Sequence, residues 1–241
     1  MTHSHSPTAD RPLTATAQDL RRGARAAVPV LLGFVPFALV LGAQASQKGL
    51  SAIAVALMTG LNFGGGSEFA AIELWTSPPQ VWFVVAMTLL VNSRHLLMGA
   101  TLAPYLAHLP LKRVLPSLFF MCDESWAMGL SDARQRHACG GFSLAYFVGL
   151  SLCLWLTWVV FTALGSAIGP QLGDIRAYGF DMAFAAVFLV LLRGMWKGFR
   201  AAQPWLVSLV CAALVHLIAP GGWYVLAGSL AGLAWAYLRA R

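Results

Sequence analysis

Long apolar segments, separated by short polar or Gly/Pro-rich breaks, occupy most of this 241-residue chain. A helix of about 20 apolar residues crosses the hydrocarbon core of a bilayer, and its backbone must satisfy its own hydrogen bonds there. The sequence therefore predicts an all-α fold, a polytopic transmembrane helical bundle of about seven or eight spans with some helices broken. The predicted segments are residues 26–45, 50–75, 81–106, 114–130, 142–168, 177–196, 204–218 and 223–238.

The composition excludes a large water-soluble domain. Apolar residues make up 59% of the chain and charged residues 10%, and the mean hydropathy is +0.70, whereas soluble domains carry roughly 25% charged residues. We expect the polar residues 1–20 to form a disordered cytoplasmic tail and residues 21–241 to form one transmembrane domain. A cleavable signal peptide is not expected, because the first apolar segment follows Arg21, Arg22 and Arg25 and is long enough to span the membrane.

The net charge of +7 indicates contact with membrane lipid rather than with nucleic acid. The Lys and Arg residues lie in short loops between apolar segments, as the positive-inside rule describes, and not on one polar face. With the N-terminus in the cytoplasm, eleven of the 16 Lys and Arg residues fall on the cytoplasmic side. This predicts a multi-pass protein of the bacterial inner membrane. The residues placed on the outer side are Lys48, Lys112, Arg113 and Arg176.

The cysteines do not form a recognisable metal or disulfide site. They have no CxxC spacing, and three of the four lie inside apolar runs, so we interpret them as small buried apolar residues. No metal and no cofactor are expected. The four are Cys122, Cys139, Cys153 and Cys211.

Three polar sequences interrupt the apolar segments, and a charged residue at the centre of a membrane helix costs about 2.5–3.5 kcal/mol on insertion scales. Three successive glycines in the first sequence each weaken a helix by roughly 1 kcal/mol relative to alanine. We expect the helix to unwind or restart there, so that free backbone groups and a half-helix N-terminus face a solute. Alternatively, the glycines only permit close helix crossing, with the acid near an interface. The residues are Gly64, Gly65, Gly66, Ser67 and Glu68.

The second sequence is Asn92-Ser93-Arg94-His95, preceded by at least ten mostly apolar residues. An Arg at this depth must pair with an acid or face water. Asn92 and Arg94 are candidates for binding a substrate carboxylate, and His95 is a candidate proton relay. The alternative, the end of a shorter helix, applies less to Arg94 than to His95. The candidate partners of Arg94 are Glu68, Glu73, Asp123 and Glu124.

The third sequence is the acidic pair Asp123-Glu124, inside the apolar run 119–130. Neighbouring residues point about 100° apart on a helix, so at least one carboxylate needs a proton or a partner to avoid a high cost in lipid. A carboxylate that exchanges a proton is what a proton-coupled carrier requires. The alternative is a static ion pair with Arg94.

In order and spacing, these sequences resemble the successive motifs of the AzlC family, the large subunits of branched-chain amino acid exporters. The resemblance extends from about Arg21 to the C-terminus. One departure is Glu68, where the family usually has Gln. The matching residues are Gly64-Gly65-Gly66-Ser67-Glu68-Phe69, Asn92-Ser93-Arg94-His95-Leu96-Leu97 with Ala103-Pro104, Asp123-Glu124-Ser125, Tyr146-Phe147-Val148-Gly149, Trp158 and Gly179-Phe180-Asp181.

The resemblance implies a permease that exports the branched-chain amino acids leucine, isoleucine and valine, with a small membrane subunit of the AzlD type as its partner. The acids in apolar segments favour proton coupling. The candidate substrate-binding residues are Gly64, Gly65, Gly66, Ser67, Glu68, Asn92 and Arg94. The candidate proton-coupling residues are Asp123, Glu124 and His95.

Two other classes of function remain open from the sequence. Ser67 and His95 offer a nucleophile and a base to an intramembrane hydrolase, but the chain lacks Gly-x-Ser-x-Gly, His-Glu-x-x-His and phosphate-loop motifs. A non-transporting scaffold subunit is the other alternative, although a scaffold has no need of costly intramembrane charges. We therefore expect a transporter rather than an enzyme.

Overall fold

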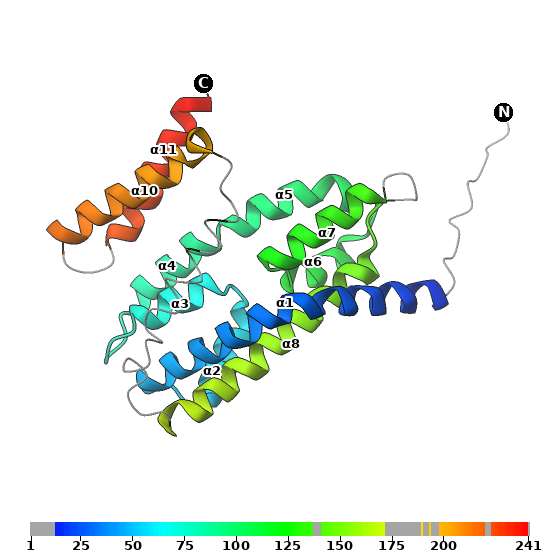
Figure 1. Cartoon of the computed structure of the whole chain (residues 1–241), viewed down its shortest axis with the longest axis horizontal. Helices are drawn as coiled ribbons and strands as arrows, with labels where there is room; N and C mark the ends of the chain where they lie inside the picture. Colours follow the sequence, from blue (N-terminus) through cyan, green and yellow to red (C-terminus); the bar gives the residue numbers. More distant parts are fainter. Residues whose placement is uncertain are drawn as a thin grey trace.

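The computed structural model describes residues 13–136, 141–171, 198–219 and 223–240, together with Leu189 and Arg193. Within these residues every regular element is a helix (Figure 1), which confirms the predicted all-α membrane bundle. The predicted segment 177–196 lies outside the described residues except for Leu189 and Arg193. Four described stretches are long and apolar enough to cross a membrane: Thr16–Gln47, Val81–Leu106, Leu144–Gln171 and Phe199–Ile218.

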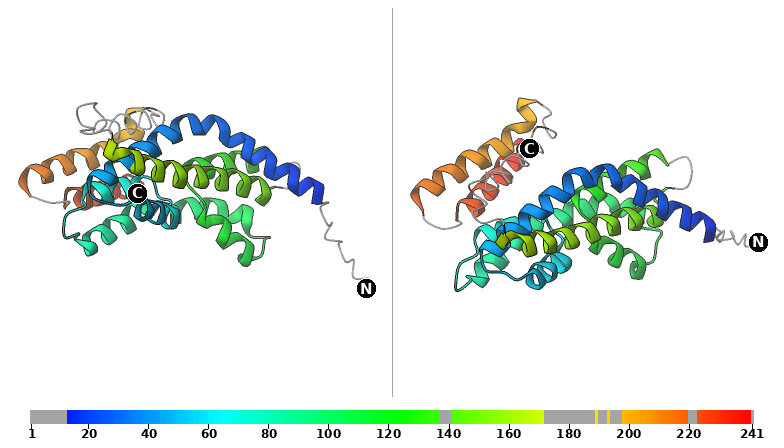
Figure 2. Two further views of the ribbon diagram at one scale, coloured as in Figure 1. Left: turned by 90° about the horizontal axis from the view of Figure 1, so that it is seen from below. Right: turned by 60° about the horizontal axis from the view of Figure 1, so that its bottom comes forward.

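Two long helices, α1 (Leu13–Gln47) and α8 (Leu144–Ile168), pack side by side along most of their lengths (Figures 1 and 2). Gly23 of α1 lies against the backbone of Tyr146, and Gly42 lies against the backbone of Thr162, so the two helices run in the same direction. Small residues at such crossings allow close helix approach. We call the end where both helices begin the Arg22 end, and the end where α1 stops the Lys48 end.

The first helix begins earlier than the sequence predicts. Residues 13–20 are helical, so the expectation of a disordered tail is wrong for this part, whereas residues 1–12 lie outside the described chain. The physical reason is that Asp19 has fixed partners: its carboxylate accepts hydrogen bonds from Ser143 Oγ at 2.7 Å and from Arg136 Nη2 at 3.0 Å.

Two short helices replace the predicted segment 50–75. They are α2 (Ala52–Asn62) and α3 (Gly66–Glu73), separated by a tip at residues 63–65. The expected unwinding is therefore confirmed for Gly64 and Gly65, and Gly66 begins the new helix.

The pair α2–α3 is a hairpin that begins and ends at the Lys48 end. Along α2, Thr59 meets Thr162 of α8, with their Oγ1 atoms 3.0 Å apart. After the tip, α3 returns, because Lys48 Nζ donates to the carbonyl oxygen of Glu73 at 3.3 Å and to that of Trp75 at 3.4 Å. Segment 50–75 does not cross as a single helix.

The next span consists of α4 (Val81–Asn92) and α5 (Arg94–Leu106), with Ser93 as the single residue between them. The Ser93 hydroxyl donates to the carbonyl oxygen of Leu90 at 2.6 Å, so a side chain competes with the helical hydrogen bonds at this point. The break places Arg94 at the start of α5, where the backbone changes from one helix to the next.

A second hairpin occupies the predicted segment 114–130, which is therefore one of the broken segments. It consists of α6 (Leu111–Phe119) and α7 (Asp123–Gln135), with a tip at residues 120–122. The two acids Asp123 and Glu124 occupy the first turn of α7, where negative charge stabilises a helix N-terminus.

The hairpin α6–α7 begins and ends at the Arg22 end. Helices α5 and α7 run in the same direction, because Arg94 pairs with Asp123 at their starts and Trp126 Nε1 donates to Thr101 Oγ1 at 2.8 Å farther along. Helix α6 begins shortly after α5 ends and runs back toward the tip. The basic pair at its start, Lys112-Arg113, therefore lies at the Arg22 end, and the expectation that it faces the side of Lys48 is wrong.

The last described helices, α10 (Phe199–Ile218) and α11 (Trp223–Ala240), form an antiparallel pair beside the rest of the molecule (Figure 1). Gly228 of α11 packs against the backbone of Ser208 in α10. A tilted ring contact joins Trp223 to Phe83 of α4, with centroids 6.3 Å apart.

Candidate functional site

A cavity of about 510 Å³ lies where the tips of both hairpins meet the break between α4 and α5. All three polar sequences singled out above contribute to its wall. The polar contributors are Gly64, Gly65, Gly66, Arg94, Asp123 and Glu124. The apolar contributors include Phe34, Phe63, Met98, Trp126, Ala127 and Trp158.

Arg94 joins the two hairpin tips. Its Nη1 donates to Asp123 Oδ2 at 2.7 Å, and its Nη2 donates to the carbonyl oxygen of Gly64 at 2.7 Å. The expected pairing of Arg94 with an acid is therefore confirmed. The Arg94 and Asp123 side chains remain 36% and 47% exposed, so the ion pair is open to the cavity rather than sealed in the core.

Three helices begin at the cavity: α3 at Gly66, α5 at Arg94 and α7 at Asp123. The first amides of a helix have no partner within the helix, and the helix dipole makes this end favourable for negative charge. The wall therefore combines helix N-termini and a guanidinium, which suit a carboxylate, with carboxylates that suit a cation.

The two glycines of the first tip have different surroundings. Gly65 has φ 54°, in the left-handed region that favours glycine, and a Cβ there would point into open space. Gly64 is crowded, because a Cβ would come within 2.6 Å of Asn92 Oδ1 and would also collide with Ser67 Oγ. Gly64 is thus required for close packing, whereas Gly65 gives the tip its turn and leaves the cavity open.

Glu68 lies behind the cavity wall and is 1% exposed. Its Oε2 accepts a hydrogen bond from Trp158 Nε1 at 2.6 Å, and its Oε1 accepts from the Gly64 amide at 3.1 Å and from Asn62 Nδ2 at 3.4 Å. In the described chain no Lys, Arg or His forms an ion pair with it. Glu68 is therefore enclosed by protein and is not exposed on the surface of the described chain.

Asn92 and Ser67 belong to a hydrogen-bonded chain that supports the first tip. Asn92 Nδ2 donates to Asn62 Oδ1 at 2.9 Å, and Asn62 Nδ2 donates to Ser67 Oγ at 2.8 Å. Neither Asn92 nor Ser67 lines the cavity, although both stand among the candidate substrate-binding residues. Their side chains position the tip in this structure.

His95 stands apart from Ser67. Its Nδ1 lies 3.1 Å from the carbonyl oxygen of Asn92, while the Ser67 hydroxyl is bonded to Asn62. The structure thus gives the serine and the histidine separate partners, and the nucleophile–base pair of the hydrolase alternative is not formed. His95 is also absent from the cavity wall, unlike Asp123 and Glu124.

The apolar part of the wall was not identified from the sequence. Phe34 and Trp158 face each other across α1 and α8, with ring centroids 5.0 Å apart. Met98 and Ala127 are the fifth residues of α5 and α7. The only sequence signal was their position within one helical turn of a polar motif, since both follow the motif by three or four residues.

The family described as AzlC protein matches residues 29–172, which include both hairpins and the cavity. No solved structure matches the chain.

Three relatives are similar over most of their lengths. A membrane protein of Archaeoglobus fulgidus is 28% identical over 88% of this chain and 91% of its own. The branched-chain amino acid transport protein AzlC of Bacillus subtilis is 25% identical over 85% of this chain and 78% of its own. A membrane protein of Helicobacter pylori is 23% identical over 78% of this chain and 82% of its own. The match across both hairpins and the cavity shows that this chain is a membrane protein of the AzlC family.

Proposed function

We propose that the protein carries branched-chain amino acids across the bacterial inner membrane and binds them in the cavity between the hairpin tips. The observation that carries this proposal is the Arg94–Asp123 pair, which is exposed to the cavity and links the two tips. The relative from Bacillus subtilis, described as a branched-chain amino acid transport protein, supports the substrate class.

The charges on the wall are complementary to a zwitterion. An α-amino acid brings one carboxylate and one ammonium group, and it can insert between Arg94 and Asp123 so that each charge exchanges one partner for another. No charge is then left unpaired in a region where unpaired charge is costly. The amides at the start of α3 add donors on the carboxylate side. The exchange favours amino acids over singly charged solutes.

The apolar part of the wall favours an aliphatic side chain. Phe34, Met98, Trp126 and Trp158 offer carbon and ring surface beside the charged pair. Burying an aliphatic side chain against such surface is favourable by about 1.5–3 kcal/mol. A side chain with its own charge would lose its hydration without a partner, which supports leucine, isoleucine and valine as substrates.

The distribution of basic residues supports a cytoplasmic location for the Arg22 end. The described residues there include Arg21, Arg25, Lys112 and Arg113, whereas Lys48 marks the opposite end. By the positive-inside rule, the N-terminus then lies in the cytoplasm. We further propose that transport is outward and that a small AzlD-type subunit is the partner. Both parts rest on the resemblance of the three motifs to those of the branched-chain amino acid exporters.

Proton coupling is the last part of the proposal. Asp123 and Glu124 line the cavity at the start of α7, and His95 lies close by in the first turn of α5. Exchange of Arg94 from Asp123 to a substrate carboxylate changes the charge around both acids, which favours uptake of a proton at the same step. Glu68, buried without a cationic partner, is a further acid for this role.

The central test measures exchange of labelled leucine in proteoliposomes, with and without an added AzlD-type subunit. We expect unlabelled isoleucine and valine to compete, and lysine and glutamate not to compete. Asp123→Asn should reduce exchange at least tenfold, whereas Glu73→Gln, an acid at the Lys48 end of α3, should leave it unchanged. Absence of exchange by the wild-type protein in both preparations would contradict transport, and equal exchange by the two variants would contradict the binding site.

Coupling is tested separately, by imposing a pH gradient on the same vesicles. The response of leucine flux to the gradient is measured for each variant, relative to its residual exchange at equal pH. The variants are Asp123→Asn, Glu124→Gln and Glu68→Gln. We expect at least one variant to lose the response while keeping part of the exchange. If all three respond as the wild type does, coupling through these acids is wrong.

A further inference from the structure

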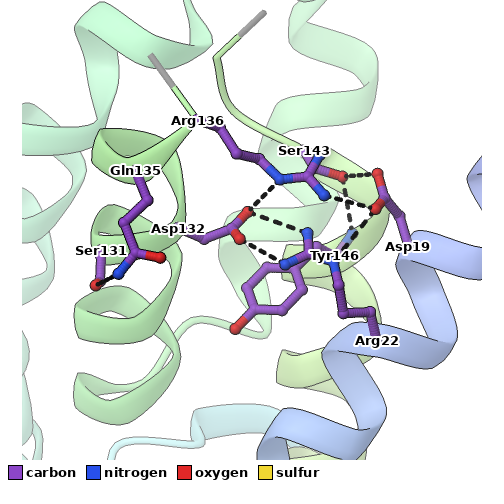
Figure 3. A network of polar contacts seen from close by, with 8 residues as sticks. All are labelled: Asp19, Arg22, Ser131, Asp132, Gln135, Arg136, Ser143 and Tyr146. Carbon is purple, nitrogen blue, oxygen red and sulfur yellow. Dashed lines mark hydrogen bonds and ion pairs between the residues drawn. The ribbon is translucent and has the colours of Figure 1, made fainter. Parts of the chain in front are cut away.

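A network of ion pairs joins α1 to α7 at the Arg22 end of the molecule (Figure 3). Arg22 of α1 donates through both terminal nitrogens to the carboxylate of Asp132 in α7, at 2.5 and 3.2 Å. Arg136, just after α7, donates to Asp19 of α1 at 3.0 Å, and its Nε lies 3.5 Å from Asp132. Ser143, just before α8, donates to Asp19 at 2.7 Å. We call these five residues the latch.

The latch holds α7 to α1, and α1 in turn contacts α8 at the same place. The guanidinium of Arg22 lies over the ring of Tyr146 in α8, 4.1 Å from the centroid. The side chains of Arg22 and Asp132 are 37% and 12% exposed, so the network is in partial contact with solvent. Partly exposed ion pairs are weak individually, which allows the network to open and to form again.

Helix α7 is therefore held by ion pairs at its two ends. Asp123 in its first turn pairs with Arg94 in the cavity, and Asp132 in its last turns pairs with Arg22. The 13 residues between its bounds span about 20 Å at 1.5 Å per residue. The hairpin α6–α7 thus reaches from the cavity to the Arg22 end.

The other hairpin is attached differently. Helix α2 packs directly on α8: Trp155 Nε1 donates to the carbonyl oxygen of Gly60 at 3.0 Å, and the Thr59 and Thr162 hydroxyls are bonded to each other. These contacts are buried or partly buried and close-packed. Contacts of this kind resist sliding, so α2–α3 is expected to stay with α1 and α8 when α6–α7 moves.

We propose that the hairpin α6–α7 is the gate between the cavity and the Arg22 side of the membrane, and that the latch keeps this gate closed. The proposal rests on the cavity being the transport site. Binding of a zwitterion at Arg94 and Asp123 loosens one end of α7, and opening of the latch frees the other end. Helix α7 is thus held by a weak attachment at each end. This suits a gate, because the open and closed states of a gate must differ little in free energy.

The test uses Cys122, which lies at the tip of this hairpin and lines the cavity, as a reporter. In a protein whose other cysteines are replaced by serine, the rate of Cys122 modification by a membrane-impermeant thiol reagent is measured on sealed vesicles of both orientations. Gln135→Cys, at the exposed end of α7, identifies which vesicles present the Arg22 end. The readout needs no transport, so failure of the transport proposal and failure of the gate are distinguishable.

Breaking the latch should expose Cys122 from one side only. We expect Arg22→Gln to raise the modification rate from the Arg22 side at least threefold, with no increase from the Lys48 side. Arg21→Gln, which removes the neighbouring charge outside the latch, should have no effect. Combining Arg22→Gln with Asp132→Asn should add little to either single variant, because both remove the same pair.

Three outcomes would overturn the proposal. They are an unchanged rate in Arg22→Gln, an equal rise from both sides, or a rise from the Lys48 side alone. Thermal unfolding in detergent checks that each variant is folded. If Arg22→Gln does not fold, Arg136→Gln is used instead, because it removes the bond to Asp19. The proposal then requires that Arg136→Gln raise the Cys122 modification rate from the Arg22 side only.

Discussion

Glu68 and Ser125 occupy equivalent positions in the two hairpins. Each is the third residue of the helix that follows a tip, and each is almost completely buried. Each also accepts a hydrogen bond from a backbone amide of its own tip: Glu68 Oε1 from Gly64 at 3.1 Å, and Ser125 Oγ from Cys122 at 2.9 Å. Because the hairpins come from opposite ends, the construction resembles the inverted repeats of secondary transporters, with the site at their meeting point.

The bridge made by Arg94 predicts a strict requirement for a guanidinium. Arg94→Lys keeps the charge, but one ammonium cannot reproduce the planar fork that serves both Asp123 and Gly64. We expect leucine exchange in proteoliposomes to fall at least tenfold. Arg113→Lys, an exposed position in α6, is the matched control and should retain wild-type exchange. Equal exchange by the two variants would show that charge alone suffices.

The open space beside Gly65 predicts that a side chain there blocks the cavity. Gly65→Leu should abolish exchange, both by filling the cavity and by placing a branched residue at a positive φ, a strain of about 1–3 kcal/mol. Gly99→Leu, which also has open space around it but lies away from the cavity, should retain exchange. Both proteins should insert and elute as folded species in detergent. Normal exchange by Gly65→Leu would mean that the glycines serve packing alone.

The contact between α1 and α8 predicts a difference between two glycines of one helix. A Cβ at Gly42 would overlap the backbone of Thr162 and Ser166, whereas a Cβ at Gly33 has no atom within 4 Å. Gly42→Ala should lower the free energy of unfolding by about 1–3 kcal/mol, the usual cost of overpacking. Gly33→Ala should leave it unchanged or slightly raised. Thermal unfolding in detergent measures both, and similar midpoints would argue against close contact.

The hydrogen bond to Glu68 predicts a difference between two tryptophans of α8. Trp158→Phe removes the donor to Glu68 Oε2, and we expect a loss of about 2–3 kcal/mol of stability because the acceptor is a buried carboxyl group. Trp155→Phe removes a donor to the Gly60 carbonyl and should cost about 1 kcal/mol. Denaturation of the purified variants compares them. A larger loss for Trp155→Phe would contradict the importance assigned to Glu68.

The sequence predicted the first tip better than the second. Low helix propensity alone predicts a break in the helix at Gly64, Gly65 and Gly66. The tip at residues 120–122 contains no glycine or proline. Because its residues are as apolar as those beside them, hydropathy placed the tip inside one apolar segment. A signal was present, since Asp123 and Glu124 are typical of the first turn of a helix. We instead interpreted them only as intramembrane charges.

Contacts between distant segments were less predictable. The pairing of Arg94 with an acid followed from the cost of an isolated charge, but four acids were available and only the fold selects Asp123. Nothing local indicates that Trp158 donates to Glu68. The latch was missed because Asp19 and Asp132 are ordinary residues near segment ends, and their pairing depends on the direction in which α7 returns.

The bond between Glu68 and Trp158 also has a consequence for synthesis of the protein. Ninety residues separate the two partners, so α3 leaves the ribosome long before α8 exists to receive its carboxyl group. Helices of 11 and 8 residues are too short to cross a bilayer, so the first hairpin is not expected to be stable in lipid by itself. We therefore expect the hairpin to reach its final position only after α8 has emerged.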